Sequence, residues 1–213
     1  MTDKKRAPVR TTYRHGDLHR ALLEAGIELA KELGPEAVTL REATRRAGVV
    51  PNAAYRHFAS HGVFMESVRS AALAAMARAM ERRLRALGPE RDDLDFARAT
   101  LRAVGAAYLQ FARKETGLFR TAFVVKFNPP PNPDARMAGR SGLNPFQLLS
   151  AALDRVARAG GLPTSHRPGA EYLAWSAVHG MAMLSIDGPL RRIGATQYEA
   201  LGSRLLDMVE KGV

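Results

Sequence analysis

The stretch GVVPNAAYRHF, residues 48–58, carries side chains that can read the edges of nucleic-acid bases. On a helical wheel, Asn52, Ala53 and Arg56 lie on the same side of a short helix. An Arg guanidinium pairs with guanine O6 and N7, an Asn amide pairs with adenine N6 and N7, and an Ala methyl group can meet a thymine methyl. This pattern is typical of a helix that binds in the major groove of DNA.

The residues that flank this face suit a different contact. Tyr55 and His57 lie at its sides, where their polar atoms can reach phosphate oxygens. Phosphate contacts position a protein on DNA without specifying the sequence. The alternative is a plain helical hairpin in which Asn52 and Arg56 are only solvated, and the spacing alone leaves both interpretations open.

Two short helices joined by a tight turn must position these side chains. Thr39 is a suitable N-cap, with Glu42 three residues later in the pattern of a capping box, and the helix LREATRRA ends at Gly48. Pro51 suits the first turn of a second helix, which we expect to run to the end of the stretch. Residues 39–58 are therefore predicted to form a helix-turn-helix.

The charge of the chain favours an acidic partner. The net charge is +11 and the pI is about 10.6, which suits nucleic acid or an anionic membrane surface. Lys4, Lys5 and Arg6 belong to a polar segment, residues 1–15, that we expect to be a flexible basic arm. Because arms of this kind lie along a minor groove, this segment strengthens the DNA interpretation.

Two consecutive segments, HRALLEAGIELAKELGPEAV and TLREATRRAGVVPNAAYRHFASH, carry a more specific pattern. The spacing of Thr39, Ala43, the Ala47-Gly48-Val49 run, Tyr55 and His57-Phe58 resembles the DNA-binding region of TetR-type transcriptional regulators over residues 15–68. Farther on, YLQFARKETGLFRTAF and AWSAVHGMAML are similar to a subgroup of this family whose C-terminal domain bears a Trp-x-x-x-His-Gly signature. Here the signature residues are Trp175, His179 and Gly180.

The resemblance implies a homodimeric, ligand-responsive protein, usually a repressor, that binds a palindromic double-stranded DNA operator. It also assigns roles by position. Phosphate contacts fall on Thr39, Tyr55 and His57. Base-reading positions fall on Arg41, Asn52, Ala53 and Arg56.

Three positions depart from the family pattern. Val50 stands where a serine often caps the recognition helix, so a side-chain acceptor is missing. Asn52 replaces a small residue, often glycine. His61 stands where a lysine commonly holds phosphate, and a neutral imidazole makes this DNA contact weaker and pH-sensitive. We expect these changes to alter affinity and base preference rather than the fold.

The composition predicts an all-α protein. Ala, Leu, Arg and Glu dominate, runs of β-branched residues are scarce, and breaker residues separate about nine helices. We expect a three-helix helix-turn-helix DNA-binding domain over residues 16–62. A long helix would join it to a helical ligand-binding and dimerisation bundle over residues 63–213.

The last two predicted helices point to a dimer interface. No Asp, Glu, Lys or Arg lies between Tyr172 and Ile186, so this helix needs partners on more than one side. The final helix carries one apolar seam at spacings of three, four and three. We predict an isologous four-helix interface, with a monomeric core helix as the alternative. Its expected residues are Leu173, Ala177, Gly180, Leu184, Tyr198, Leu201, Leu205 and Met208.

Aromatic and methionine side chains at helical spacing suggest a cavity for a small apolar or aromatic ligand. The alternative is ordinary core packing, which is the commoner role of such residues. The candidate ligand contacts are Phe111, Phe119, Phe123, Trp175, His179 and Met183.

Several other functions find no support in the sequence. The chain has no cysteine, no HExxH motif and no glycine-rich phosphate loop after a strand, so we expect no enzyme, no metal site and no cofactor. It lacks a signal peptide and an apolar run of about 18 residues, which predicts a cytoplasmic protein without a membrane partner. The remaining alternatives are a non-specific architectural DNA-binding protein and a ligand-sequestering helical bundle.

Overall fold

The structure, a computed structural model, describes residues 15–124 and 135–212 of the 213-residue chain. Every regular element in these ranges is helical, which confirms the predicted all-α class. The nine α-helices of the described residues are α1 (His15–Leu33), α2 (Leu40–Ala47), α3 (Pro51–Ala54), α4 (His61–Arg85), α5 (Leu94–Lys114), α6 (Thr116–Ala122), α7 (Pro145–Arg158), α8 (Ala170–Ile186) and α9 (Ala195–Gly212). Short 3-10 segments are η1 (Pro35–Ala37), η2 (Ala135–Met137) and η3 (Thr164–His166).

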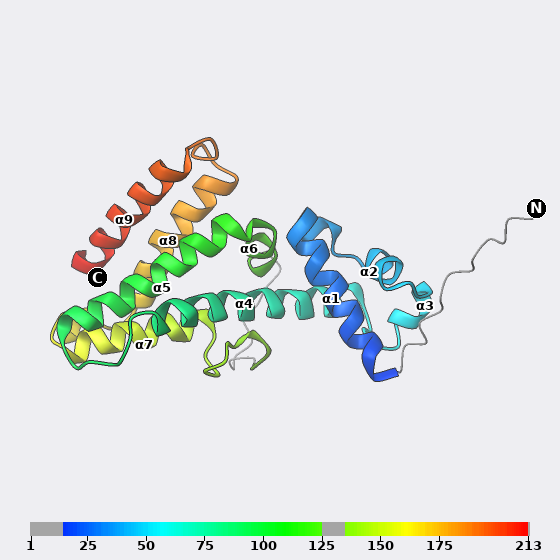
Figure 1. Cartoon of the computed structure of the whole chain (residues 1–213), viewed down its shortest axis with the longest axis horizontal. Helices are drawn as coiled ribbons and strands as arrows, with labels where there is room; N and C mark the ends of the chain where they lie inside the picture. The colour runs from blue at the N-terminus through cyan, green and yellow to red at the C-terminus, as the bar shows by residue number, and fades with distance from the viewer. Residues whose placement is uncertain (1–14, 125–134, 213) are drawn as a thin grey trace, which may run out of the picture.

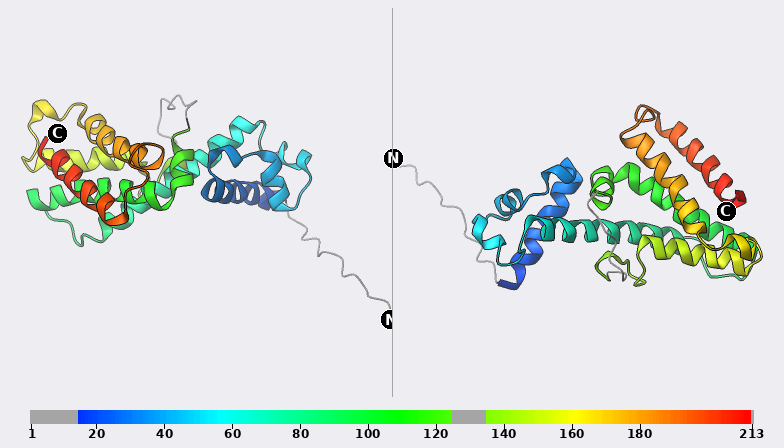
Figure 2. Two further views of the ribbon diagram at one scale, coloured as in Figure 1. Left: turned by 90° about the horizontal axis from the view of Figure 1, so that it is seen from above. Right: turned by 180° about the vertical axis from the view of Figure 1, so that it is seen from behind.

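The long helix α4 runs through most of the elongated molecule (Figure 1). Helices α1, α2 and α3 gather around its N-terminal end, and α5 and α7 pack along its C-terminal part. Helices α8 and α9 lie on the side of α5 away from α4, as the right-hand view of Figure 2 also shows. The short helix α6 lies where these two groups of helices meet, in contact with both α1 and α4.

A missing side chain lets α1 approach α4 closely. A Cβ atom at Gly26 would lie 2.7 Å from Cζ of Phe64 and 2.7 Å from Cγ2 of Val68. Phe64 and Val68 are fully buried. Glycine weakens a helix by itself, but here it makes room for two large core side chains of α4. The N-terminal helices are therefore held directly on the long helix.

The predicted helix-turn-helix is present, but its second helix ends at Ala54, earlier than expected. The backbone N–H groups of His57 and Phe58 both donate to the Ala54 carbonyl at 2.9 Å, which closes one turn after the helix. Phe58 nevertheless anchors the segment. Its ring is 1% exposed, and it lies 4.6 Å from the ring of His19 and 5.0 Å from that of Phe64.

Helix α5 begins at Leu94. The carboxylate of Asp93 accepts a 2.6 Å hydrogen bond from the N–H of Phe96, so Asp93 is the N-cap. An aspartate at this position satisfies one of the free N–H groups at the start of a helix.

Helix α6 makes close contacts with other helices at both of its ends. Near its start, a Cβ atom at Gly117 would lie only 2.0 Å from the carbonyl oxygen of Ala30, in the last turn of α1. Near its end, the carbonyl of Ala122 accepts a 3.3 Å hydrogen bond from Nη1 of Arg69 on α4. Arg69 is buried and forms an ion pair with Glu66 at 2.8 Å. Helix α6 is thus a bridge between α1 and α4.

We predict that Gly117→Ala lowers the free energy of unfolding by about 1–3 kcal/mol, the usual cost of overpacking a tight contact. The new methyl group would meet backbone atoms, which cannot rotate out of the way. The change is measured by urea denaturation. Gly62→Ala is the matched control, because its Cβ would have only an ordinary 3.6 Å contact with Oγ of Ser60. Equal stability of the two variants would contradict this close approach.

Candidate functional site

Local interactions define the hairpin of α2 and α3. The Thr39 side chain accepts a 3.2 Å hydrogen bond from the N–H of Glu42 at the start of α2. Gly48 ends this helix with φ of 68°, a left-handed conformation that glycine adopts without strain. The N–H of Val49 then donates to the Thr44 carbonyl at 3.0 Å. These contacts set the angle at which α3 leaves α2.

The first residues of α3 show the expected departure from good capping. Val50 is the N-cap in an extended conformation, and it makes no side-chain hydrogen bond to the helix. Its side chain is 70% exposed, and Pro51 occupies the first turn. The start of α3 is therefore set by the proline and by Ala54, which is fully buried, rather than by a capping side chain.

The predicted base-reading and phosphate-contacting residues of α3 and the turn after it are accessible to solvent to different degrees. Asn52, Tyr55 and Arg56 are exposed, while Ala53 and His57 are half-buried beside them. Ala54 is buried and holds this short helix against the core, while the exposed side chains next to it are accessible to a partner. Asparagine and arginine can meet base edges from such a surface.

The remaining predicted DNA contacts lie around this surface. Arg41 is exposed on α2, Thr39 is half-buried at its N-cap, and His61 is exposed at the start of α4. Lys4, Lys5 and Arg6 fall outside the described residues.

Ion pairs separate the basic residues of α2 into two groups. Arg45 pairs with Glu42 at 2.6 Å, and Arg46 pairs with Glu32 of α1 at 2.6 Å. The hydrogen bonds from these arginines lower the pKa of both carboxyl groups. Arg41, in contrast, has no ion pair with any described residue, and the same holds for Arg56 of the turn after α3. Their charges remain available for an acidic partner.

A second cluster of polar and aromatic side chains lies in the C-terminal helices. The hydroxyl of Tyr108 on α5 lies 2.7 Å from Nδ1 of His179 on α8, and it accepts a 3.1 Å hydrogen bond from Nε1 of Trp175. Because the Trp N–H can only donate, the Tyr108 hydroxyl is left free to donate to Nδ1. Burial raises the pKa of Tyr108 and lowers the pKa of His179, so both groups are neutral at pH 7.

Aromatic rings surround this hydrogen-bonded trio. The ring of Phe119 lies 5.0 Å from that of Phe123, whose ring lies 4.8 Å from His179 and 6.0 Å from Trp175. Four of the six predicted ligand residues therefore lie together. Phe111 is buried in α5 without a ring contact to this cluster among the described residues.

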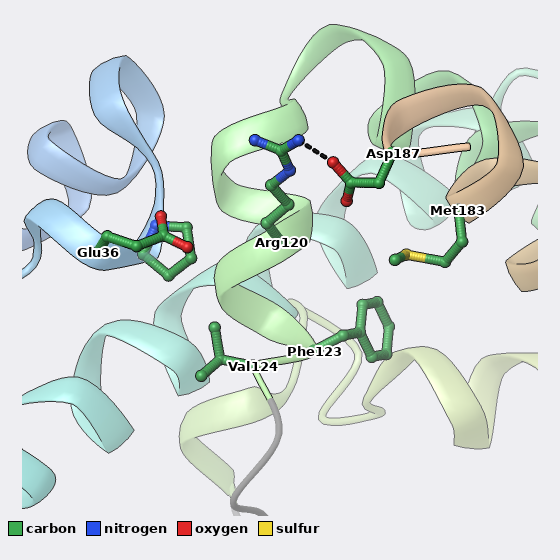
Figure 3. A pocket seen from close by; sticks show the side chains of 7 residues that line it. Glu36, Arg120, Phe123, Val124, Met183 and Asp187 are labelled. Atoms are coloured by element: carbon green, nitrogen blue, oxygen red, sulfur yellow. Dashed lines mark hydrogen bonds and ion pairs between the residues drawn. The ribbon is translucent and has the colours of Figure 1, made fainter. Parts of the chain in front are cut away.

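A cavity of about 320 Å³ adjoins the cluster, and Met183, the last of the predicted ligand residues, lines it together with Phe123 (Figure 3). Its other lining residues come from η1, α6 and the end of α8: Pro35, Glu36, Arg120, Val124 and Asp187. The sequence did not single out these residues, and it also missed Tyr108. They are far apart along the chain, and only the packing of α6 brings them together.

The predicted dimer residues divide by exposure. Leu173 and Leu184 of α8 and Met208 of α9 are exposed, with 64%, 46% and 59% of their surface accessible. Ala177, Gly180, Leu201 and Leu205 are half-buried. Tyr198 lies differently from the expectation. It is 6% exposed, and its hydroxyl donates to the Leu109 carbonyl at 3.0 Å, so it belongs to the packing of α9 on α5 within one chain.

The described residues provide neither a metal site nor a membrane-spanning helix. No group of three or more His, Cys, Asp or Glu side chains is placed to hold a metal ion in these ranges. Across residues 15–124 and 135–212, no helix combines the length and apolar character needed to cross a membrane.

The chain belongs to the TetR family of bacterial regulatory proteins. Residues 22–67 match the family described as bacterial regulatory proteins, tetR family, and residues 101–209 match the tetracyclin repressor-like C-terminal domain. The protein is therefore a transcription regulator with a helix-turn-helix DNA-binding domain and a C-terminal helical domain, and not an enzyme. Regulators of this family bind DNA operators, form dimers and bind small-molecule ligands.

Solved structures share the fold over nearly the whole chain. A protein of unknown function from Rhodococcus sp. RHA1 is 22% identical, with a TM-score of 0.72 over 96% of this chain and 99% of that one. A Shewanella sp. PV-4 protein, provisionally assigned as a tetR family transcription regulator, is 16% identical, with a TM-score of 0.57 over 89% and 96%. The provisionally assigned regulatory protein SCO4313 is 17% identical, with a TM-score of 0.52 over 92% and 100%. No curated protein sequence matches the chain significantly.

The unusual N-cap gives a direct prediction. Val50→Ser should make the protein more stable than Val50→Ala by about 1 kcal/mol, because a serine side chain can accept a hydrogen bond from the first turn of α3. Both variants remove the valine, so the difference between their stabilities measures the contribution of the serine cap. Thermal unfolding of both proteins measures it. Indistinguishable melting temperatures would mean that α3 does not begin at residue 51.

Proposed function

We propose that this protein is a homodimeric, sequence-specific repressor that leaves its operator when a small apolar or aromatic ligand binds. The observation that carries the DNA-binding part is the surface of α3 and its following turn. Asn52 and Arg56 are exposed there, Arg56 has no ion pair with a described residue, and Ala54 and Phe58 are buried behind them. A rigid support with free polar groups is what direct readout of bases requires.

The proposed roles of the single residues follow from their places. Asn52, Ala53 and Arg56 would read bases, with Arg41 at the edge of the same surface. Thr39, Tyr55, His57 and His61 would hold phosphates, and Lys4, Lys5 and Arg6 would reach the minor groove. Residues 1–15 would be the arm, 16–62 the DNA-binding domain and 63–213 the ligand-binding and dimerisation domain.

Apolar exposure on α8 and α9 supports the dimer. Tyr172, Leu173, Leu184 and Met208 are all at least 46% exposed, although the rest of their helices packs in the core. Gly180 is open on its outer side, where a Cβ atom would meet no neighbour within 4 Å. A second copy related by a twofold axis would cover both helices and form a four-helix interface. Tyr198 is excluded from this surface because it is buried in its own chain.

The ligand part of the proposal rests on the aromatic cluster and the cavity beside it. Phe123 and Met183 would contact the ligand, with Phe119 and His179 packed against the ring of Phe123, and Trp175 and Tyr108 would complete the cluster around His179. Trp175, His179 and Gly180 also support placement in the subgroup with the Trp-x-x-x-His-Gly signature. A cytoplasmic location would fit this function.

The coupling would run through α6 and α4. A ligand that displaces α6 also moves its contacts with α1 at Gly117 and with α4 at Arg69. Helix α1 packs against α2, and Phe64 of α4 packs against Phe58, so both α1 and α4 support the DNA-binding hairpin. Their movement would change the spacing of the two recognition helices in the dimer. A nearly complete switch needs a ligand that prefers one state by about 5.5 kcal/mol.

Selection from random double-stranded DNA tests the proposed function. We expect a palindromic sequence with half-sites about 10 base pairs apart, and we expect Arg56→Ala to lose preference at one base position, with a cost of about 1–3 kcal/mol on the original site. Arg45→Ala is the control, because Arg45 is paired with Glu42 on the same hairpin.

The outcomes separate the alternatives. DNA binding without any enriched sequence would identify an architectural protein, and no DNA binding would leave a ligand-sequestering bundle. If Arg56→Ala weakens all sequences equally, Arg56 contacts phosphate and not a base.

A further inference from the structure

The cavity beside α6 lies at the junction between the helix-turn-helix and the C-terminal helices. Pro35 and Glu36 come from η1, which connects α1 to α2, while the other lining residues come from α6 and α8. Figure 3 shows Glu36 extending from η1 toward α6, while Phe123 and Met183 lie on the other side of α6. A molecule bound here would touch both parts of the protein at once. Its volume, about 320 Å³, is at the lower end of the range for small-molecule sites.

The charges around the cavity leave one carboxylate without a partner. Arg120 forms an ion pair with Asp187, drawn as a dashed line in Figure 3, so these two charges offset each other. Glu36 is exposed and makes no ion pair or hydrogen bond with any described residue. The formal charge of the lining is therefore −1, in a chain whose net charge is +11.

The apolar part of the lining is suited to a positively charged organic group. Phe123 offers an aromatic ring, with the thioether of Met183 and the side chain of Val124 nearby. Aromatic faces attract cations because their ring electrons carry negative charge. The ring of Phe123 is also held in place by Phe119 and His179, at 5.0 and 4.8 Å.

We propose that this junction cavity binds a small organic cation with an apolar or aromatic body. The ammonium group would lie in the space that Glu36 and Phe123 both line, and the body would pack on Met183 and Val124. An organic anion fits less well, because Arg120 is already paired and two carboxylates line the same space. Cation binding stands independently of the proposed function, and only its regulatory consequence rests on that function.

The regulatory consequence follows from the position of η1. The carbonyl of Pro35 accepts a hydrogen bond from the N–H of Val38, and Thr39 directly after it caps α2. A ligand fixed between Glu36 and α6 would restrain this connection. It would therefore change the orientation of the helix-turn-helix relative to the C-terminal helices, and operator affinity with it.

Three related probes test the site without DNA: benzyltrimethylammonium, benzyl alcohol and phenylacetate. Trp175 is the only tryptophan of the chain, and its ring lies 6.0 Å from that of Phe123, so its fluorescence reports binding. Isothermal titration calorimetry gives an independent affinity. We expect the cation to bind at least about fivefold more tightly than the alcohol, and the anion to bind most weakly.

Glu36→Gln keeps the shape of the side chain and removes its charge. We expect this variant to bind the cation about three- to fivefold more weakly, the range for one partly exposed charge pair, and to bind benzyl alcohol as before. Glu24→Gln is the matched control, because Glu24 is an exposed glutamate of α1 outside the cavity lining. It changes the net charge by the same amount and should leave all three affinities unchanged.

Several results would overturn the assignment. These are preferential binding of phenylacetate, no preference for the cation over the alcohol, or equal effects of Glu36→Gln and Glu24→Gln. Operator binding is measured separately, with and without the cation. A protein that binds the cation but no operator would refute the proposed function and leave the cavity assignment standing.

Discussion

The approach of α6 to the backbone of α1 is the contact on which the arrangement of the two halves depends. Gly117 faces the Ala30 carbonyl so closely that no side chain fits between them. A contact between backbones cannot adjust by rotating a side chain, so α1 and α6 must move together or separate. The position of the DNA-binding helices is thus tied to a helix of the C-terminal part of the chain.

Direct contacts connect α6 both to the DNA-binding helices and to the junction cavity. Toward the DNA, α1 holds α2 through the ion pair of Glu32 with Arg46 and supports Phe58 through its ring contact with His19. Toward the ligand, α6 carries Arg120 and Phe123, which line the junction cavity. Arg69 adds a link from the end of α6 to α4. A ligand can shift such an assembly only by its difference in affinity for the two states.

The sequence was most informative where local rules decide the structure. The Thr39 cap and the end of α2 at Gly48 follow from residue types at fixed spacings, and the structure confirms them. The end of α3 was predicted too late because Phe58 belongs to the core although it lies outside the helix. Periodicity shows that a residue faces inward, but it does not show where the helical hydrogen bonds stop.

The sequence was least informative where distant segments meet. Tyr108 bonds to His179 across 71 positions, and nothing near either residue signals that pairing. The sequence of the last helix shows one apolar seam, but Tyr198 in that seam packs on α5 of its own chain. Glu36 and Asp187 meet at one cavity only because α6 lies between their elements. Such features depend on helix packing, which a one-dimensional pattern does not contain.

In the proposed twofold dimer, the two recognition helices lie one turn of DNA apart. The chain has no cysteine, so Ala59→Cys, an exposed position just after Phe58, accepts one spin label in each protomer. Pulsed electron paramagnetic resonance on the complex with the selected operator should give one narrow distance close to the helix spacing of about 34–36 Å. The absence of any coupling between labels, or a broad distribution that operator DNA does not narrow, would contradict the account.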